Sequence, residues 1–309
     1  MDRLAVGGMA EVFRAVEPRA VGEPRVVVVK RMLPAIAAEA GAHDMFEQEA
    51  KLGASIRHPN VVEVLGAGDE DGQPYLALEY VRGVDLWRLQ RVLRRRGESL
   101  GTDLALFVAI ELLRGIQAIH VATDARGRPL GVVHRDVSPS NVLLSVHGDV
   151  KLGDLGIARS QRRPGAPTHG PLDERAKGKL GYLAPEQVAG GRLDQTADIF
   201  SAAVVTAELL MNRPLFSGGS ELAVLLAIRD GHIHPFVEWA TGALPGPLAE
   251  VLVRALAKDP ASRFRDARGF RKALEPHLGQ DDEVLRRALA RCVSSAMNAD
   301  SAGAEDDLA

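Results

Sequence analysis

The strongest constraint on this chain is the stretch 134–156, where two short apolar runs alternate with polar loops. The runs 142–144 and 150–152 consist mainly of valine and leucine. A glycine-containing turn separates them, which predicts a hairpin of two short strands. One polar loop precedes the first strand, and a second loop follows the last one. A chain that folds back in this way brings the polar side chains of both loops to one point.

Three side chains on these loops have the chemistry of a phosphate-handling site. Asn141 and Asp154 offer oxygen ligands for a hard cation that keeps several waters and bridges phosphates. Asp136 is left free to orient a hydroxyl nucleophile and accept its proton. The hairpin therefore predicts a metal site beside a general base.

The residues of these loops are H-R-D-V-S-P-S-N at 134–141 and D-L-G at 154–156. They resemble the catalytic loop and the metal-binding motif of the eukaryotic-type (Hanks-type) serine/threonine protein kinases, and are most similar to bacterial members. The resemblance implies transfer of the γ-phosphate of ATP to protein hydroxyls. Asp136 is then the catalytic base, while Asn141 and Asp154 hold Mg²⁺.

The same resemblance implies an α+β fold of two lobes, with a small antiparallel-sheet N-lobe, a larger and mainly helical C-lobe, and ATP between them. The expected limits are a kinase domain at 1–276, with the N-lobe at 1–80, the hinge at 79–84 and the C-lobe at 84–276, followed by a C-terminal helix and a disordered acidic tail within 277–309. We expect that helix at 281–292 and disorder from Asn298 onward.

Composition and charge exclude other classes of protein. The 309 residues carry a net charge of -3, which gives no electrostatic case for binding nucleic acid or an anionic membrane. The single cysteine, Cys292, excludes an internal disulfide framework and fits a reducing compartment. The most apolar stretch, 199–211, contains Glu208 and is too short to span a bilayer. We therefore expect a cytoplasmic protein with no membrane segment, whose partners are ATP and protein substrates; its oligomeric state is not readable from the sequence.

The N-terminal part carries the residues expected around the phosphates. L-A-V-G-G-M-A-E-V at 4–12 resembles the family's glycine-rich loop, although alanines replace its first and third glycines. The V-V-V-V-K run that ends in Lys30 resembles the strand whose lysine holds the α- and β-phosphates, with Val28 in place of the family's alanine. Glu49 is the expected acidic partner of Lys30, and Glu47 is the competing candidate.

The end of a later strand resembles the hinge between the lobes, where backbone groups of Glu79 and Val81 contact adenine. Asp85 is placed to reach the ribose, but the cap of the following helix is an equally good explanation. The residues that the resemblance assigns to nucleotide binding are Val6, Gly7, Gly8, Val12, Val28, Lys30, Glu79, Val81, Asp85 and Leu143.

Three residues of the C-terminal half resemble structural landmarks of the family. Glu186 of the A-P-E motif is expected to pair with Arg263, and Asp198 is expected to hydrogen-bond the backbone of the catalytic loop from below. A surface salt bridge and a helix cap are the alternatives.

Two positions depart from the family's pattern. Serine/threonine members carry a lysine two residues after the catalytic aspartate, where it steadies the γ-phosphate, and here this residue is Ser138. They carry a threonine seven residues before the glutamate of the A-P-E motif, and here this residue is Lys179. Our hypothesis is that Lys179 supplies the charge that Ser138 lacks, which makes it a catalytic residue. The alternative is that Lys179 points to solvent and Mg²⁺ alone holds the γ-phosphate.

Other functions stay open at this point. One is a catalytically silent, ATP-binding scaffold that acts through the basic helix 86–96 or the acidic tail, and another is a kinase of small molecules. The first is opposed by retention of five groups, which are Lys30, Glu49, Asp136, Asn141 and Asp154. A full A-P-E motif argues against the second. We also expect Asp173 and Glu174 to pair with Arg135, so that activity depends only weakly on autophosphorylation.

Overall fold

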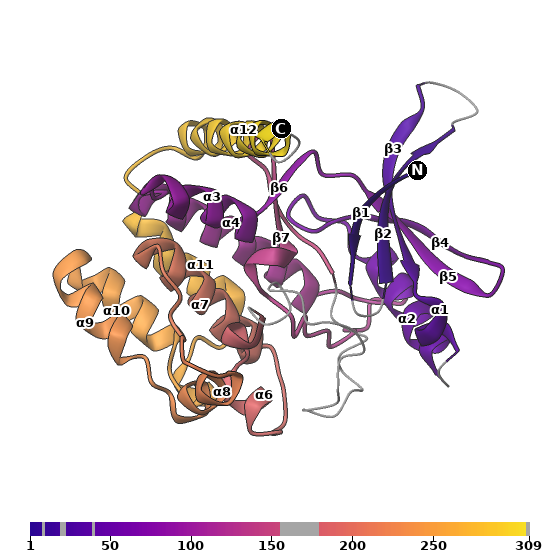
Figure 1. Cartoon of the computed structure of the whole chain (residues 1–309). Coiled ribbons are helices and arrows are strands. Elements are labelled where there is room, and N and C mark those ends of the chain that lie inside the picture. Colours follow the sequence, from indigo (N-terminus) through magenta and orange to yellow (C-terminus); the bar gives the residue numbers. More distant parts are fainter. Residues whose placement is uncertain (8–9, 19–22, 39–40, 155–178, 307–309) are drawn as a thin grey trace.

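The computed structural model describes residues 1–7, 10–18, 23–38, 41–154 and 179–306. The N-terminal elements are β1 (Asp2–Val6), β2 (Ala10–Glu17), β3 (Arg25–Met32), α1 (Pro34–Ala37), α2 (Ala42–Ser55), β4 (Val64–Glu70) and β5 (Gln73–Glu79). They form a small lobe in which both helices lie beside one antiparallel sheet of strand order β1-β2-β3-β5-β4 (Figure 1).

The remaining elements form a larger, mainly helical lobe (Figure 1). Its strands and its helices up to the catalytic hairpin are β6 (Gly83–Asp85), α3 (Leu86–Arg96), α4 (Thr102–His120), η1 (Pro139–Asn141), β7 (Val142–Ser145) and β8 (Val150–Leu152). The later helices are η3 (Lys179–Tyr182), α6 (Pro185–Val188), α7 (Thr196–Met211), α8 (Glu221–Asp230), α9 (His234–Ala243), α10 (Gly246–Ala255), η4 (Pro260–Ser262), α11 (Ala267–Leu274), η5 (Glu275–His277) and α12 (Asp282–Asp306). The α+β, two-lobed architecture that the sequence implied is confirmed.

Strand β3 is central to the N-lobe because it pairs with β2 on one side and β5 on the other. Its four consecutive valines are β-branched and suit a pleated, half-buried surface. Val12 of β2 and Leu76 of β5 lie directly opposite Lys30, and Leu78 lies opposite Val28. Cross-strand partners share a face, and alternate residues of a strand do so too, so these five side chains all lie on one face of the sheet.

The C-lobe is built around α4 and α7, which pack against each other. Both helices are apolar around most of their circumference and almost fully buried, as expected for helices in the centre of a large lobe. The predicted catalytic hairpin forms from β7 and β8, and β8 packs on α4. The helical core therefore supports the hairpin. Among the described residues, no helix is both long enough and apolar enough to cross a bilayer.

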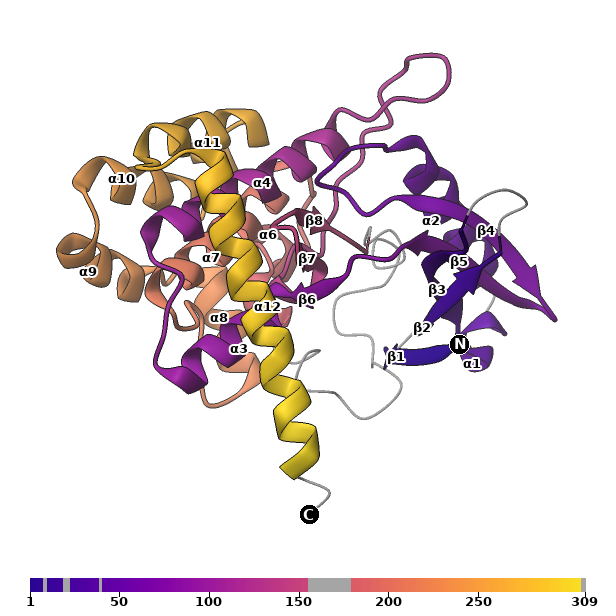
Figure 2. The same cartoon turned by 90° about the horizontal axis from the view of Figure 1, so that it is seen from above.

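The C-terminal helix differs from its prediction. We expected a helix at 281–292 and disorder from Asn298, but α12 continues to Asp306. It lies along the C-lobe against α3, α4, β6 and β7 (Figures 1 and 2). Leu285, Leu289 and Val293 follow one another at a spacing of one helical turn, and all three are buried in the main core. Burial of this stripe stabilises α12 as part of the C-lobe.

Candidate active site

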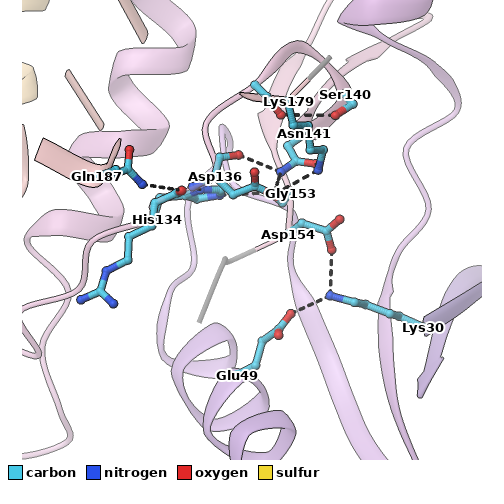
Figure 3. Close-up of polar contacts among 12 residues, drawn as sticks. Lys30, Glu49, His134, Asp136, Ser140, Asn141, Gly153, Asp154, Lys179 and Gln187 are labelled. Atoms are coloured by element: carbon cyan, nitrogen blue, oxygen red, sulfur yellow. Dashed lines mark hydrogen bonds and ion pairs between the residues drawn. The ribbon is translucent and has the colours of Figure 1, made fainter. Parts of the chain in front are cut away.

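Lys30 reaches from the N-lobe sheet to two carboxylates (Figure 3). Its Nζ donates to Glu49 Oε1 at 2.8 Å and to Asp154 Oδ1 at 2.9 Å. Glu49 comes from α2, and Asp154 follows β8, so one ammonium group joins both lobes. Glu47 instead pairs with Lys51 on the exposed side of α2. Glu47 lies two positions from Glu49, so the two side chains point to different faces of the helix. The predicted choice of Glu49 over Glu47 is confirmed.

The charges of this group are strongly coupled. Burial alone lowers the pKa of Lys30, but the carboxylates of Asp154 and Glu49 outweigh it and raise that pKa above its usual value. The Lys30 ammonium lowers the pKa of Asp154 to about 2. Burial raises the pKa of Glu49 despite its contact with Lys30. Lys30 and Asp154 are therefore both charged at neutral pH and ready to meet phosphate and a metal cation.

The catalytic loop holds Asp136 and Asn141 against each other. Asn141 Nδ2 donates to the carbonyl of Asp136 at 2.8 Å and to its carboxylate at 2.9 Å. Lys179 points at the same two residues, with Nζ 3.0 Å from Asp136 Oδ2 and 3.0 Å from Asn141 Oδ1 (Figure 3). The alternative of a solvent-directed Lys179 is wrong, because its side chain is mostly buried in this contact.

The loop is fixed from below by a buried carboxylate. Asp198, in the first turn of α7, accepts hydrogen bonds from the backbone N–H groups of His134 and Arg135, each at 2.7 Å. It also lies 2.7 Å from His120 Nε2. Burial raises the pKa of Asp198, but hydrogen bonding to His120 and the nearby histidines keep that pKa below its usual value. The predicted support from Asp198 is confirmed, whereas its contact with His120 had no signal in the sequence.

Two residues of the site have left-handed backbone geometry. Arg135 has φ 64° and Asp154 has φ 53°, a region that non-glycine residues rarely adopt. Arg135 directly precedes Asp136, and Asp154 itself carries the carboxylate that is predicted to hold the metal. Such conformations cluster at functional sites, where the surrounding structure fixes them.

Strand β8 is held by Asn60, a residue that the sequence analysis did not connect with the site. Its carbonyl accepts from the N–H of Leu152, and its Nδ2 donates to the carbonyl of Val150, both at 2.9 Å. The same Nδ2 donates to buried Glu111 of α4 at 2.8 Å. Asn60 thus sets the position of the strand that carries Asp154.

The hinge residues lie where β5 ends and β6 begins. Glu79 uses its carboxylate to pair with Lys151 at 2.7 Å, a contact that the sequence analysis missed. Asp85 accepts from the N–H of Arg88 at 2.7 Å and therefore caps α3, as the alternative explanation predicted. Leu143 lies opposite Asp85 in the small sheet. Contacts of Val81 with adenine stay a prediction.

The glycine-rich turn is only partly described. Gly7 donates its N–H to the carbonyl of Ala10 at 2.8 Å, which closes a turn between β1 and β2. Val6 precedes this turn at the end of β1 and is exposed. Gly8 lies outside the described residues. Asp173 and Glu174, the acidic pair expected to contact Arg135, also lie outside the described residues.

The residues around the A-P-E motif are anchored to the C-lobe. Glu186 forms a bidentate ion pair with fully buried Arg263, whose Nη1 and Nη2 donate to the two carboxylate oxygens at 2.7 and 2.8 Å. This contact confirms the predicted pair. Tyr182 donates to Glu208 of α7 at 2.6 Å. Gln187 donates to the carbonyl of Arg135 and so ties α6 to the catalytic loop. The last two contacts were not predicted.

The donor set suits a magnesium ion that arrives with a nucleotide. Asn141 and Asp154 supply one amide and one carboxylate oxygen, and each already faces an ammonium group. Within the described part of the chain, no three His, Cys, Asp or Glu side chains gather closely enough to hold a metal ion. Mg²⁺ typically uses one or two carboxylates together with waters and phosphates, so two protein ligands fit it.

Comparison with known proteins shows which family this geometry belongs to. The family model described as the protein kinase domain matches residues 1–271. The chain belongs to the protein kinase family. Its kinase domain is 39% identical over 278 residues to the tyrosine-protein kinase MasK of Myxococcus xanthus, an alignment that covers 90% of this chain and 42% of MasK.

Other similar proteins are also bacterial. The kinase domain is 30% identical over 288 residues to the serine/threonine-protein kinase PknL of Mycobacterium tuberculosis, covering 93% of this chain and 65% of PknL. The crystal structure of the PknI kinase domain from the same species matches with a TM-score of 0.60 at 27% identity, covering 89% of this chain and 93% of that structure. The chain therefore spans 42% of the length of MasK and 65% of that of PknL.

Proposed function

We propose that this chain transfers the γ-phosphate of ATP to serine or threonine hydroxyls of protein substrates. The observation that carries the proposal is the convergence of Lys30, Asp136, Asn141 and Asp154 at one site between the lobes. Phosphoryl transfer needs positioning and neutralisation of charge, and these groups supply both. Asn141 and Asp154 would hold Mg²⁺, which would supply positive charge that neutralises part of the phosphate charge.

Each residue has one task in this mechanism. Lys30, braced by Glu49, binds the α- and β-phosphates, and Asn141 and Asp154 hold the metal. Asp136 orients the acceptor hydroxyl and accepts its proton. A bond forms between the hydroxyl oxygen and the γ-phosphorus, while the bond to the bridging oxygen breaks and ADP leaves with that electron pair.

Specificity for serine and threonine is the finer part of the proposal. PknL carries a serine/threonine-kinase name, and MasK carries a tyrosine-kinase name at higher identity. The test is incubation with labelled ATP, Mg²⁺ and a generic protein substrate, followed by phosphoamino acid analysis, with Asp136→Asn as the control. Phosphoserine and phosphothreonine in the wild type alone support the proposal. Phosphotyrosine alone refutes its specificity, and transfer equal to that of the control refutes the activity.

A further inference from the structure

The position of a single positive charge distinguishes this catalytic loop from the family's pattern. Ser138 stands where a lysine is expected, and its hydroxyl lies 3.2 Å from the hydroxyl of Ser140, so neither residue brings a cation. Lys179, which comes from another part of the chain, brings an ammonium group to the catalytic loop. It contacts Asp136 and Asn141, the base and one metal ligand, at 3.0 Å each.

Lys179 is held in place by a well-anchored segment. It is the first residue of η3, which ends at Tyr182. Besides the contact of Tyr182 with Glu208, the carbonyl of Tyr182 accepts from the hydroxyl of Ser201 at 2.7 Å. Both partners belong to the buried helix α7. The Lys179 ammonium is therefore set beside the base before substrate binds, which is the condition for effective electrostatic stabilisation.

The contacts of Lys179 place its ammonium in the catalytic centre rather than only beside the loop. Its Nζ lies 3.0 Å from Asn141 Oδ1, one of the two side-chain oxygens proposed to hold the metal. A side chain that touches Asp136 also lies next to the position of the acceptor hydroxyl, because Asp136 must be within hydrogen-bonding distance of that hydroxyl.

We propose that Lys179 is a catalytic residue that neutralises the transferring γ-phosphoryl group, in place of the lysine missing at position 138. This inference rests on the proposed phosphotransfer. Charge in that transition state is spread over the three equatorial oxygens of phosphorus. Lys179 donates to Asp136 and Asn141 and keeps one N–H donor, together with its positive charge, for those oxygens. The proton of the acceptor hydroxyl still goes to Asp136, so Lys179 acts by charge and not as an acid.

The relocation also gives the site a means of regulation. A lysine at position 138 would belong to the catalytic loop, which Asp198 fixes from below. Lys179 instead belongs to the segment that leads into the A-P-E motif. Any displacement of that segment withdraws the γ-phosphate cation from the site. The position of η3 is thereby coupled to the chemical step.

The decisive experiment removes the positive charge at position 179 and restores one at position 138. Lys179→Ala is compared with Lys179→Arg, with the double variant Ser138→Lys/Lys179→Ala, and with Lys51→Ala, which removes an exposed lysine of α2. The measurements are kcat, KM, the Kd for ATP and the melting temperature of each variant. We expect Lys179→Ala to lower kcat by about 100- to 1,000-fold with nearly unchanged Kd for ATP, as for loss of one preorganised charge-stabilising donor. Lys51→Ala is expected to behave as wild type.

Partial recovery of kcat in the double variant or in Lys179→Arg supports the assignment, because a purely structural role at position 179 would not be restored by a lysine at position 138. Unchanged kcat in Lys179→Ala overturns it. So does a loss that neither the arginine nor the relocated lysine reverses, since Lys179 would then only hold the loop. An inactive wild type refutes the proposed function instead, which keeps the two failures distinct.

Discussion

Helix α12 begins at Asp282, beyond the match to the kinase family, which ends at residue 271, yet it is packed as part of the C-lobe. Leu289 is the sharpest probe of this packing because it is 0% exposed within the main core. Replacing a fully buried leucine by alanine loses its transfer free energy and leaves a cavity. We expect Leu289→Ala to lower the free energy of unfolding by about 3 kcal/mol, within the range of roughly 2–5 kcal/mol for such sites.

The matched control is Val284→Ala on the same helix, where the side chain is 47% exposed. This change should stay within about 0.5 kcal/mol of wild type. Urea unfolding followed by tryptophan fluorescence is a suitable assay, since Trp87 lies on α3, which contacts α12. For 309 residues, an unfolding entropy of about 2.1 cal/mol/K per residue converts the loss at Leu289 into a fall in Tm of about 5 °C. Equal unfolding midpoints for the two variants would show that α12 does not belong to the folded core.

Three further predictions concern the site and its support. Arg263→Ala should lower the free energy of unfolding by about 3–5 kcal/mol in chemical denaturation, because it leaves the Glu186 carboxylate without its buried partner; a change below about 1 kcal/mol would contradict this. Lys30→Met should abolish phosphotransfer in the labelled-ATP assay while preserving the fold, and retained turnover would remove Lys30 from the mechanism. The pKa of Asp154 is lowered to about 2 from its usual 3.8, so its stabilisation is complete above that usual value and lost as the pH falls towards the lower one. Acid titration of stability should therefore show a wild-type advantage over Asp154→Asn that is constant at pH 5–7 and shrinks below about pH 4; an advantage that does not change at low pH would refute this.

The site was predictable from the sequence to the extent that it is encoded locally. The valine and leucine runs on either side of a glycine turn fix β7 and β8, and the strand-ending Lys30 follows from its valine run. The partners Glu49 and Arg263 came from the order of motifs rather than from any local pattern. Lys179 was found because two departures from that order complement each other in charge.

The contacts that could not be predicted depend on backbone geometry in three dimensions. The packing of α12 is one example, because its apolar stripe stabilises the helix only when it is buried against the C-lobe. Gly148, in the turn of the catalytic hairpin, has φ 81° and lies so close to α12 that an added Cβ would be 2.0 Å from the carbonyl oxygen of Arg286. A glycine in a turn is ordinary in sequence, and its role as a docking point appears only when the helix is in place.

The docking of α12 also connects it to the catalytic strand. Arg286 donates to Asp149, next to Gly148, at 2.9 Å, and its other nitrogen lies 3.7 Å from Glu111. Glu111 accepts from Asn60, which holds both ends of β8 through Val150 and Leu152. Strand β8, which leads to Asp154, is therefore held by a series of contacts that ends outside the family match. Because a buried carboxylate such as Glu111 requires its hydrogen-bonding partners, the helix and the strand position each other.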